Sequence, residues 1–430
     1  GHSSSRDLVN WEHHPAAIEA NGLGSVFSGS SVVDVNNTAG FGKDAIVSLY
    51  TSAGVSQIQS LAHSRDDGQT FEIYPGNPIL TLESEARDPN MFWDEAHNRW
   101  VLSLAHALDH EMLFFTSPDL KEWTLQSAFG KGVGAQGGVW ECPDLFKLKV
   151  DDTGEEKWVL VCNINPGGPF GGSATQYFVG DFDGTMFKAD TDASGNIPTK
   201  WMDYGKDHYA TVSWSNAPDN RRTLIGWMSN WQYGGEVPTM QYRSANTIPR
   251  EVGLFRGEDG QIYMSSTPSP ELLKLRDKET VKVSNRSVGD KASVFALPTS
   301  NDGVCEILLD LDCRKADTVD ITLANKDDES VTMTYNPSDN TVSFDRRRSG
   351  IVDFSQDFPA VTVATTFRSD GKVALRIYID KSSMEVFGND GKFVMTNLVF
   401  PTKPYSTLSV SSKGGNAKIE SLKIYSIKEL

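Results

Sequence analysis

Two carboxylic acids in the first half of the 430-residue chain stand beside prolines and aromatic residues, where a lone buried charge is costly. Asp88 occurs in "EARDPNMFW" and Glu141 in "VWECPDLF". Arg87 adjoins Asp88 and is expected to keep that carboxylate ionised, whereas Glu141 has no basic neighbour in sequence, so an apolar setting should raise its pKa. Two acids with separated pKa values suit glycosidic bond cleavage, in which one acid donates a proton and the other stays negative beside an oxocarbenium-like centre.

Spacing alone leaves another interpretation open, namely that both acids are turn residues that cap strand ends. A second constellation, His106 and His110 in "HALDH", has metal-ligand spacing only on a helix. The flanking residues predict strand and loop, so we expect ordinary surface or core histidines. The sequence therefore predicts neither a metal site nor a cofactor.

The elements that must position these acids are short strands. Runs of strand length, rich in β-branched and aromatic residues and bounded by Gly, Pro, Asn or Asp, follow one another within about a dozen residues. Examples are "DAIVSLYT", "RWVLSLA", "EMLFFTS", "KWVLVCNI", "TQYFVGDF" and "RTLIGWM". Long helical patterns are missing, which indicates an all-β fold.

A repeated turn sets the architecture. An acidic residue is followed four positions later by an aromatic residue in four places: Asp7 and Trp11, Asp67 and Phe71, Asp119 and Trp123, and Asp183 and Phe187. Antiparallel repeats spaced as widely as these four turns are typical of propeller blades. The chain has room for about five blades, the first of them incomplete. Inner strands of separate blades converge on a central channel, where Asp88 and Glu141 could meet.

The pattern breaks at "SSTPSPELLKLRDKETVKV", which holds two prolines and one plausible short helix. We predict a propeller domain over 1–268, a linker over 269–283 and a β-sandwich over 284–430. The triplet Asn389-Asp390-Gly391 between apolar alternations predicts a hairpin in the sandwich.

Composition restricts the partners. The formal net charge is −17, from 40 Lys and Arg against 57 Asp and Glu, which disfavours nucleic acid and anionic lipid. No apolar run approaches the roughly 18 residues that a membrane-spanning helix needs, so no membrane insertion is expected. Four scattered cysteines suit neither a zinc site nor a disulfide scaffold.

Eight sequence stretches, distributed along the chain, together form a pattern of motifs. They are "FSGSSVVD" (27–34), "ARDPNMFW" (86–93), "WECPDLF" (140–146), "YFVGDFDG" (177–184), "DHYATVSW" (207–214), "IGWMSNW" (225–231), "NTIPRE" (246–251) and "LRIYIDKSSMEVFGNDGKFVMT" (375–396). Together they resemble the motifs of glycoside hydrolase family 32, the β-fructosidases that include invertases, inulinases and levanases. The resemblance implies a five-bladed β-propeller followed by a β-sandwich.

The resemblance also implies roles. Family members hydrolyse terminal β-fructofuranosyl bonds with retention. Carried over by motif, Glu141 is the acid/base, and Asp88, with Arg87 beside it, binds the fructose hydroxyls and steadies the transition state. The sugar pocket would be lined by Phe27, Ser28, Cys142, Asp207 or Tyr209, and one of Trp227 and Trp231.

The nucleophile of the family lies in a Trp-Met-Asn-Asp-Pro-Asn-Gly motif upstream of the stretch that here begins at Gly1, so no residue matches it. We expect a fragment of a longer polypeptide, because a propeller without its innermost first strand would expose an unpaired edge. Without the nucleophile, a retaining mechanism would slow by many orders of magnitude.

Three functions are compatible with these motifs: hydrolysis of sucrose, inulin or levan, binding of fructan without catalysis, and fructosyl transfer. The expected partner is in each case a carbohydrate. Substrate preference and oligomeric state stay open, and a periplasmic or extracellular location is favoured over the cytoplasm.

Overall fold

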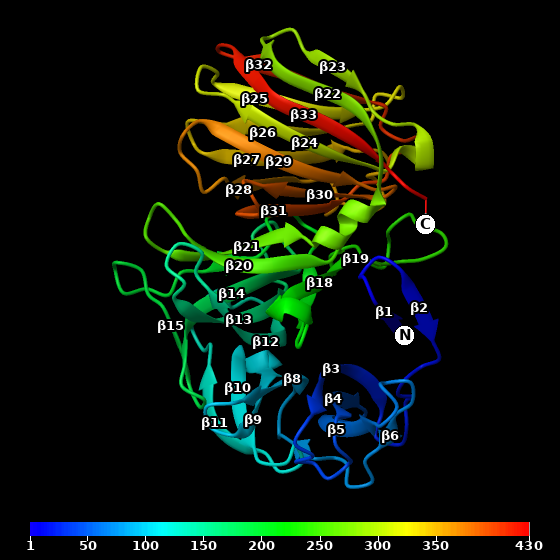
Figure 1. Ribbon diagram of the computed structural model, residues 1–430, viewed down its shortest axis with the longest axis vertical. Helices are drawn as coiled ribbons and strands as arrows, with labels where there is room; N and C mark the ends of the chain where they lie inside the picture. Colours follow the sequence, from blue (N-terminus) through cyan, green and yellow to red (C-terminus); the bar gives the residue numbers. More distant parts are fainter. Residues whose placement is uncertain (430) are drawn as a thin grey trace.

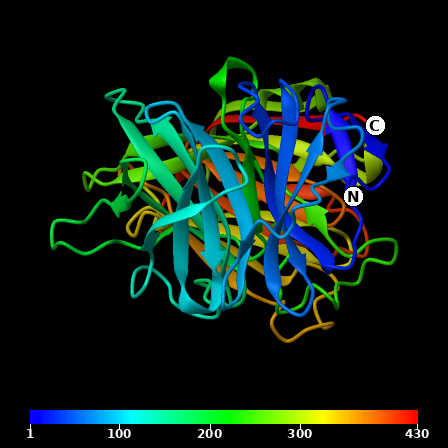
Figure 2. The ribbon, with the colours of Figure 1, turned by 90° about the horizontal axis from the view of Figure 1, so that it is seen from below.

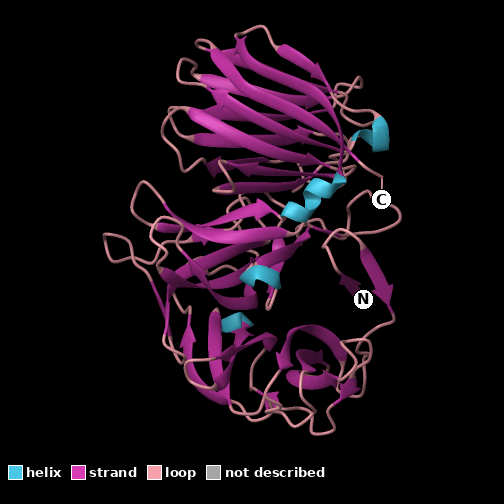
Figure 3. Cartoon of the chain, viewed as in Figure 1, coloured by secondary structure: helices cyan, strands magenta, loops and turns pink. Residues whose placement is uncertain are grey.

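The computed structural model describes residues 1–429 and shows two β domains stacked along the long axis of the molecule (Figure 1). The lower, blue-to-green domain is a β-propeller and the upper, yellow-to-red domain is a β-sandwich. Helices among the described residues are short 3-10 turns (Figure 3): η1 (Ala107–Asp109), η2 (Pro218–Asn220), η3 (Pro270–Leu275) and η4 (Ser300–Gly303). The predicted all-β class is confirmed. None of the helices in residues 1–429 is long and apolar enough to cross a membrane.

Four antiparallel sheets of four or five strands form most of the propeller. The first holds β3 (Ser25–Asp34), β4 (Ala45–Ala53), β5 (Gln57–Ser64), β6 (Glu72–Ile73) and β7 (Leu80–Thr81). The second holds β8 (Ala86–Asp94), β9 (Arg99–His106), β10 (Glu111–Ser117) and β11 (Thr124–Phe129). The third holds β12 (Val139–Lys149), β13 (Glu156–Asn165), β14 (Ala174–Phe182), β15 (Phe187–Ala189) and β16 (Lys200–Trp201). The fourth holds β17 (Tyr209–Trp214), β18 (Thr223–Met228), β19 (Ala245–Asn246), β20 (Arg250–Arg256) and β21 (Ile262–Pro268).

A two-stranded ribbon, β1 (His2–Ser5) and β2 (Trp11–His14), takes the fifth place in the propeller. The Trp11 ring stacks on that of Trp214, with centroids 6.2 Å apart, which puts the ribbon against the fourth sheet. At its other edge His2 meets Phe71 of the first sheet, with centroids 6.5 Å apart. Figure 2, viewed from the propeller end, shows the blue and cyan sheets of β3 and β8 in front of the sandwich.

The repeated acidic turn connects the third strand of a sheet with the fourth. Asp7, Asp119 and Asp183 each accept hydrogen bonds from the backbone N–H groups two and three residues further on. In the first sheet Asp66, instead of the predicted Asp67, accepts the N–H of Thr70 at 3.0 Å. Because β1 and β2 are joined by the same turn, they correspond to the third and fourth strands of a blade.

The first strands of the four larger sheets, β3, β8, β12 and β17, lie next to one another around the propeller axis. Each is interrupted by a shift of register against its partner: between Val26 and Gly29, Arg87 and Asn90, Glu141 and Asp144, and Tyr209 and Val212. Such bulges bend a strand and redirect its side chains. The sequence motifs predicted for the site coincide with these bulges.

The sandwich consists of two six-stranded sheets. One holds β22 (Arg276–Val288), β33 (Ala417–Ile427), β24 (Cys305–Asp312), β29 (Lys372–Ile379), β30 (Ser383–Gly388) and β31 (Phe393–Leu398). The other holds β23 (Ser293–Ala296), β32 (Thr407–Lys413), β25 (Thr318–Ala324), β26 (Ser330–Asn336), β27 (Thr341–Arg348) and β28 (Val361–Thr365). Alternate residues of β25 and β26 are buried, as expected for strands with one face on a core.

The boundary between the domains is tighter than predicted. η3 follows two residues after β21, and β22 begins at Arg276 and pairs with β33 along its length. Residues 276–283, predicted as linker, are therefore part of the sandwich. The pattern misleads here because β22 is an edge strand with mostly exposed, charged residues.

Candidate active site

The two predicted acids meet at the propeller axis although they are 53 positions apart in the sequence. Asp88 Oδ2 accepts a hydrogen bond of 2.9 Å from the N–H of Cys142, the residue that follows Glu141. The charge of Glu141 also contributes to raising the pKa of Asp88. Both carboxylates therefore belong to one site, formed by the bulges of β8 and β12.

Arg87 was predicted to pair with Asp88, but it pairs with Glu141. Its Nε lies 2.9 Å from Oε1 of Glu141, and its Nη1 contacts Gln57 at 3.2 Å and Glu85 at 3.0 Å. Residues adjacent on an extended strand point to opposite sides, so Arg87 and Asp88 do not share partners as their adjacency suggested.

Asp88 is buried without a direct cationic partner. The side chain is 6% exposed, and burial raises its pKa from 3.8 to about 6, outweighing the N–H of Cys142 and the charge of Arg87. The expectation that Arg87 keeps Asp88 permanently ionised is therefore wrong. Near neutral pH this carboxyl can exchange a proton, which suits a group that donates to or accepts from sugar hydroxyls.

Glu141 is the more accessible acid, with 21% of its side chain exposed. Its Oε1 accepts from Arg87, and its Oε2 accepts from the hydroxyl of Tyr209 on β17. Burial, followed by the charge of Glu141, raises the pKa of Tyr209, so that hydroxyl stays a donor. Glu141 therefore reaches solvent while two hydrogen-bond donors fix the position of its carboxyl group.

A cavity of about 200 Å³ adjoins Asp88 at the level of the bulges. Ser28, Asp88 and Cys142 of the predicted set line it. The Cys142 thiol is buried 3.6 Å from Asp88, and burial raises its pKa well above the usual value. Phe27, from the bulge of β3, is about half exposed. The first-strand bulges thus bring these four predicted residues into one neighbourhood.

Among the aromatic residues predicted to line the sugar pocket, Trp227 contacts both Tyr209 and Trp231. Trp227 packs against Tyr209 with ring centroids 6.3 Å apart and against Trp231 with centroids 5.0 Å apart. Trp231 is 59% exposed and is the outermost of the three. The exposed indole of Trp231, connected to Glu141 through Trp227 and Tyr209, offers apolar surface of the kind that packs on the C–H groups of a sugar ring.

Asp207 does not belong to the pocket. It is fully buried, and its carboxylate is bound by Arg346 and by the N–H of Leu398, both from the sandwich. The motif "DHYATVSW" left the choice between Asp207 and Tyr209 open, and the structure places only Tyr209 at the site. Sequence could not separate them because the partner that buries Asp207 lies 139 positions away.

Comparison with known proteins identifies the family of the chain. Residues 1–266 match the glycosyl hydrolases family 32 N-terminal domain, and residues 271–426 match the C-terminal domain of the same family. The chain belongs to glycosyl hydrolases family 32. Its relatives in the family include the levanase of Bacillus subtilis, which is 40% identical over 444 residues that cover 100% of this chain and 64% of the levanase. An extracellular exo-inulinase of Aspergillus niger is 37% identical over 454 residues, covering 96% of this chain and 84% of its own length.

Solved structures of family 32 proteins share the fold. The exo-inulinase of Aspergillus awamori superposes with a TM-score of 0.92 at 36% identity, covering 100% of this chain and 90% of its own. The β-fructofuranosidase of Schwanniomyces occidentalis, complexed with fructosyl-erythritol, has a TM-score of 0.89 at 29% identity and covers 100% and 88%. The propeller and sandwich inferred from the sequence are thus those of the family.

Several residues that shape this family 32 site were missed in the sequence. Asn163 on β13 is fully buried and donates from Nδ2 to the carbonyls of Cys142, at 3.1 Å, and Thr211, at 3.3 Å. It also accepts the N–H of Thr211 at 3.1 Å, so one amide ties the bulge of β12 to that of β17. Thr51 holds the N–H of Asp88 in the same way, at 3.0 Å. Asn163 and Thr51 lie inside apolar strand patterns, and a polar residue at a buried position was the only available signal.

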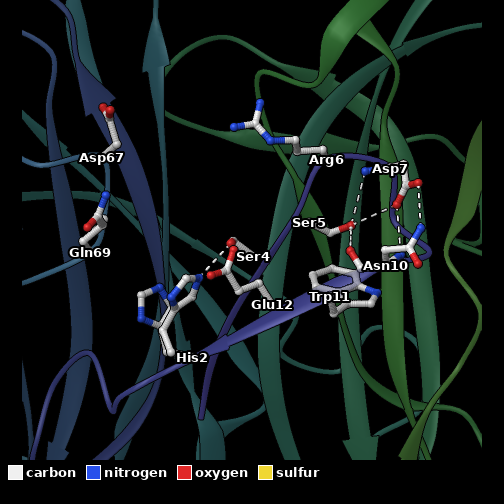
Figure 4. A pocket seen from close by; sticks show the side chains of 12 residues that line it. His2, Ser4, Ser5, Arg6, Asp7, Asn10, Trp11, Glu12, Asp67 and Gln69 are labelled. Carbon is white, nitrogen blue, oxygen red and sulfur yellow. Dashed lines mark hydrogen bonds between the residues drawn. The ribbon is translucent and has the colours of Figure 1, made fainter.

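A larger cavity, of about 1010 Å³, lies between the β1–β2 ribbon and the turn at 67–69 (Figure 4). Asp7 and Asn10 face it from one end, and Asp67 and Gln69 from the other (Figure 4). None of its lining residues belongs to the acid pair. This larger cavity is therefore separate from the acid pair at the first-strand bulges.

Proposed function

We propose that the protein hydrolyses terminal β-fructofuranosyl bonds of sucrose or fructans with retention. The observation that supports this proposal best is the arrangement of two carboxyls in unlike settings. Glu141 is accessible between Arg87 and Tyr209, and Asp88 is buried against the N–H of Cys142. In this proposal Glu141 donates a proton to the leaving oxygen, and Asp88 binds the hydroxyls of the fructosyl unit as positive charge develops on the ring.

Retention requires a nucleophilic carboxylate on the opposite side of the ring, about 5 Å from the acid/base. No motif in residues 1–430 corresponds to that group. The second candidate function that the motifs permit is binding of fructan without cleavage. Fructosyl transfer is a third outcome, in which a sugar hydroxyl replaces water as the acceptor.

Incubation with sucrose, inulin and levan, followed by measurement of free fructose, distinguishes these functions. Hydrolysis predicts fructose release that falls by at least about a hundredfold in Glu141→Gln, since general acid catalysis contributes roughly 10²–10⁴-fold. The matched control is Glu156→Gln on β13, an exposed glutamate paired with Lys147, which should leave the rate unchanged. Oligosaccharides longer than the substrate would indicate transfer, and retained binding without release would indicate the second function.

Substrate and compartment are proposed by analogy with the relatives. The named levanase and exo-inulinase indicate fructans, and the invertases among the relatives indicate sucrose. Because the exo-inulinase relative is described as extracellular, we propose that this protein also acts outside the cytoplasm. Rates with sucrose, inulin and levan measured side by side give the substrate preference.

A further inference from the structure

Two arginines are buried at the contact between the domains, one from each side. Arg250 on β20 of the propeller bonds Asp203 at 2.9 Å and Glu385 of the sandwich at 2.5 Å. Arg346 on β27 of the sandwich reaches into the propeller, where it pairs with Asp207. Both side chains are almost completely buried, so each needs its partners in place to offset the loss of hydration.

Arg346 is the centre of a closed hydrogen-bonded group. Besides Asp207, its guanidinium donates to the hydroxyl of Tyr233 at 2.7 Å and to the carbonyl of Phe358 at 2.8 Å. The Tyr233 hydroxyl donates in turn to Oδ1 of Asp207 at 2.5 Å. The N–H of Leu398 donates to Oδ2 of Asp207 at 2.7 Å. Two of the three donors to Asp207 thus come from the sandwich.

Two members of this group lie two positions in sequence from residues of the site. Asp207 precedes by two residues Tyr209, whose hydroxyl donates to Glu141. Tyr233 follows by two residues Trp231, the most exposed of the aromatic residues that connect to Tyr209 through Trp227. The backbone before Tyr209 is also fixed to β31, because the N–H of Asp207 donates to the carbonyl of Thr396 at 3.1 Å.

We propose that Arg346 is a positioning residue, through which the sandwich domain fixes the Tyr209 hydroxyl on Glu141 and the Trp231 ring against Trp227. The inference rests on the proposed function for its catalytic part, and on the hydrogen bonds above for its structural part. In this proposal the C-terminal domain contributes to catalysis, because one of its residues positions side chains of the site in the propeller. A displacement of less than about 1 Å at Tyr209 is enough to weaken its bond to Glu141.

The test compares Arg346→Met with Arg250→Met. Both variants remove a buried arginine at the same interface and leave buried acids without it, so both should lower the melting temperature. In Arg346→Met we expect kcat on sucrose to fall roughly ten- to a hundredfold. We also expect the alkaline limb of the rate–pH profile to move up, because a hydroxyl that donates to a carboxylate favours its ionised form. Arg250→Met should change kcat by less than about twofold and leave the limb in place, since Arg250 donates to Asp203, Glu385 and Thr396 and makes no hydrogen bond to Asp207, Tyr209 or Tyr233.

Two further measurements separate this inference from the proposed function. Tyr233→Phe removes one hydroxyl, and it should shift the limb in the same direction even if Arg346→Met does not fold. The near-UV circular dichroism of the close Trp227–Trp231 pair should change in Arg346→Met and not in Arg250→Met, whether or not the protein releases fructose. Absence of fructose release in the unsubstituted protein would overturn the proposed function alone. Equal effects of the two arginine variants on spectrum, kcat and limb would overturn the positioning role.

Discussion

Replacement of Asp88 by asparagine should make the protein more stable at neutral pH. Burial raises the pKa of Asp88 from 3.8 to about 6, so the folded state holds this proton more tightly than the unfolded state. As pH rises through this range, ionisation of Asp88 costs the folded state free energy. At about 1.36 kcal/mol per pKa unit, the cost above about pH 6 is about 3 kcal/mol. The asparagine side chain would stay neutral and keep an oxygen to accept the N–H of Cys142.

The measurement is the free energy of unfolding in urea for both proteins between pH 4 and pH 7.5. All ten tryptophans lie within residues 1–231, so tryptophan fluorescence reports the propeller alone. The advantage of Asp88→Asn should grow by about 2.4 kcal/mol from pH 4 to pH 7, the rest of the effect lying below pH 4. Taking the difference between the two proteins cancels the other titrating groups.

Asp203→Asn is the matched control with the opposite sign. Asp203 is also buried, but the charge of Arg250 contributes to a pKa below its usual value. This control variant should therefore be less stable than the unsubstituted protein at pH 7, and the deficit should shrink as pH falls. A difference for Asp88→Asn that is independent of pH, or that grows toward acid, would refute the argument that burial outweighs the favourable contacts of the Asp88 carboxylate.

Three further variants test the site. Asn163→Ala should lower the free energy of unfolding by about 2–4 kcal/mol, measured in urea, because it leaves backbone groups of two bulges without partners. Trp231→Ala should leave the melting temperature within about 2 °C. The same variant should weaken binding of fructose, followed by calorimetry, by about tenfold. Tyr209→Phe should move the alkaline limb of the rate–pH profile up, and an unmoved limb would contradict the contact with Glu141.

Much of the fold could be predicted because its signals are local. Each acidic turn is made within four residues, as in Asp119, whose carboxylate accepts the N–H groups of the two turn residues that follow at 2.9 Å. The strand pattern is equally local, since alternate burial in β25 appears directly as alternate apolar residues. In one turn the prediction chose the wrong one of two neighbouring acids, because Asp66 accepts the backbone N–H that was expected to bind Asp67.

The electrostatics of the site could not be predicted, because partners are chosen by strand direction and domain contact. Arg87 is adjacent to Asp88 in sequence yet pairs with Glu141, 54 positions away. Asp207 has the appearance of a pocket residue until the sandwich is in place, when Arg346 buries it. Contacts over such separations leave no trace in a single sequence.

The proline motifs have a common structural reason. In β8 and β12 the bulge falls on Asp88-Pro89 and Cys142-Pro143, where proline has no N–H to lose from the ladder. Asp88, Cys142 and Ala210 of β17 all have positive φ, of 64°, 46° and 50°. A residue other than glycine in this region costs on the order of 1–3 kcal/mol.

The strained residues and the uncompensated Asp88 carboxyl lie at the same level of the propeller, beside Glu141. Surrounding ladders and buried amides such as Asn163 hold them there, so the strain persists only because the neighbouring strands fix the bulges. A bulge in each first strand turns side chains of separate sheets toward one axis, which regular strands would keep apart. It follows that variants which regularise a bulge, like those which neutralise Asp88, should gain stability at the expense of the site.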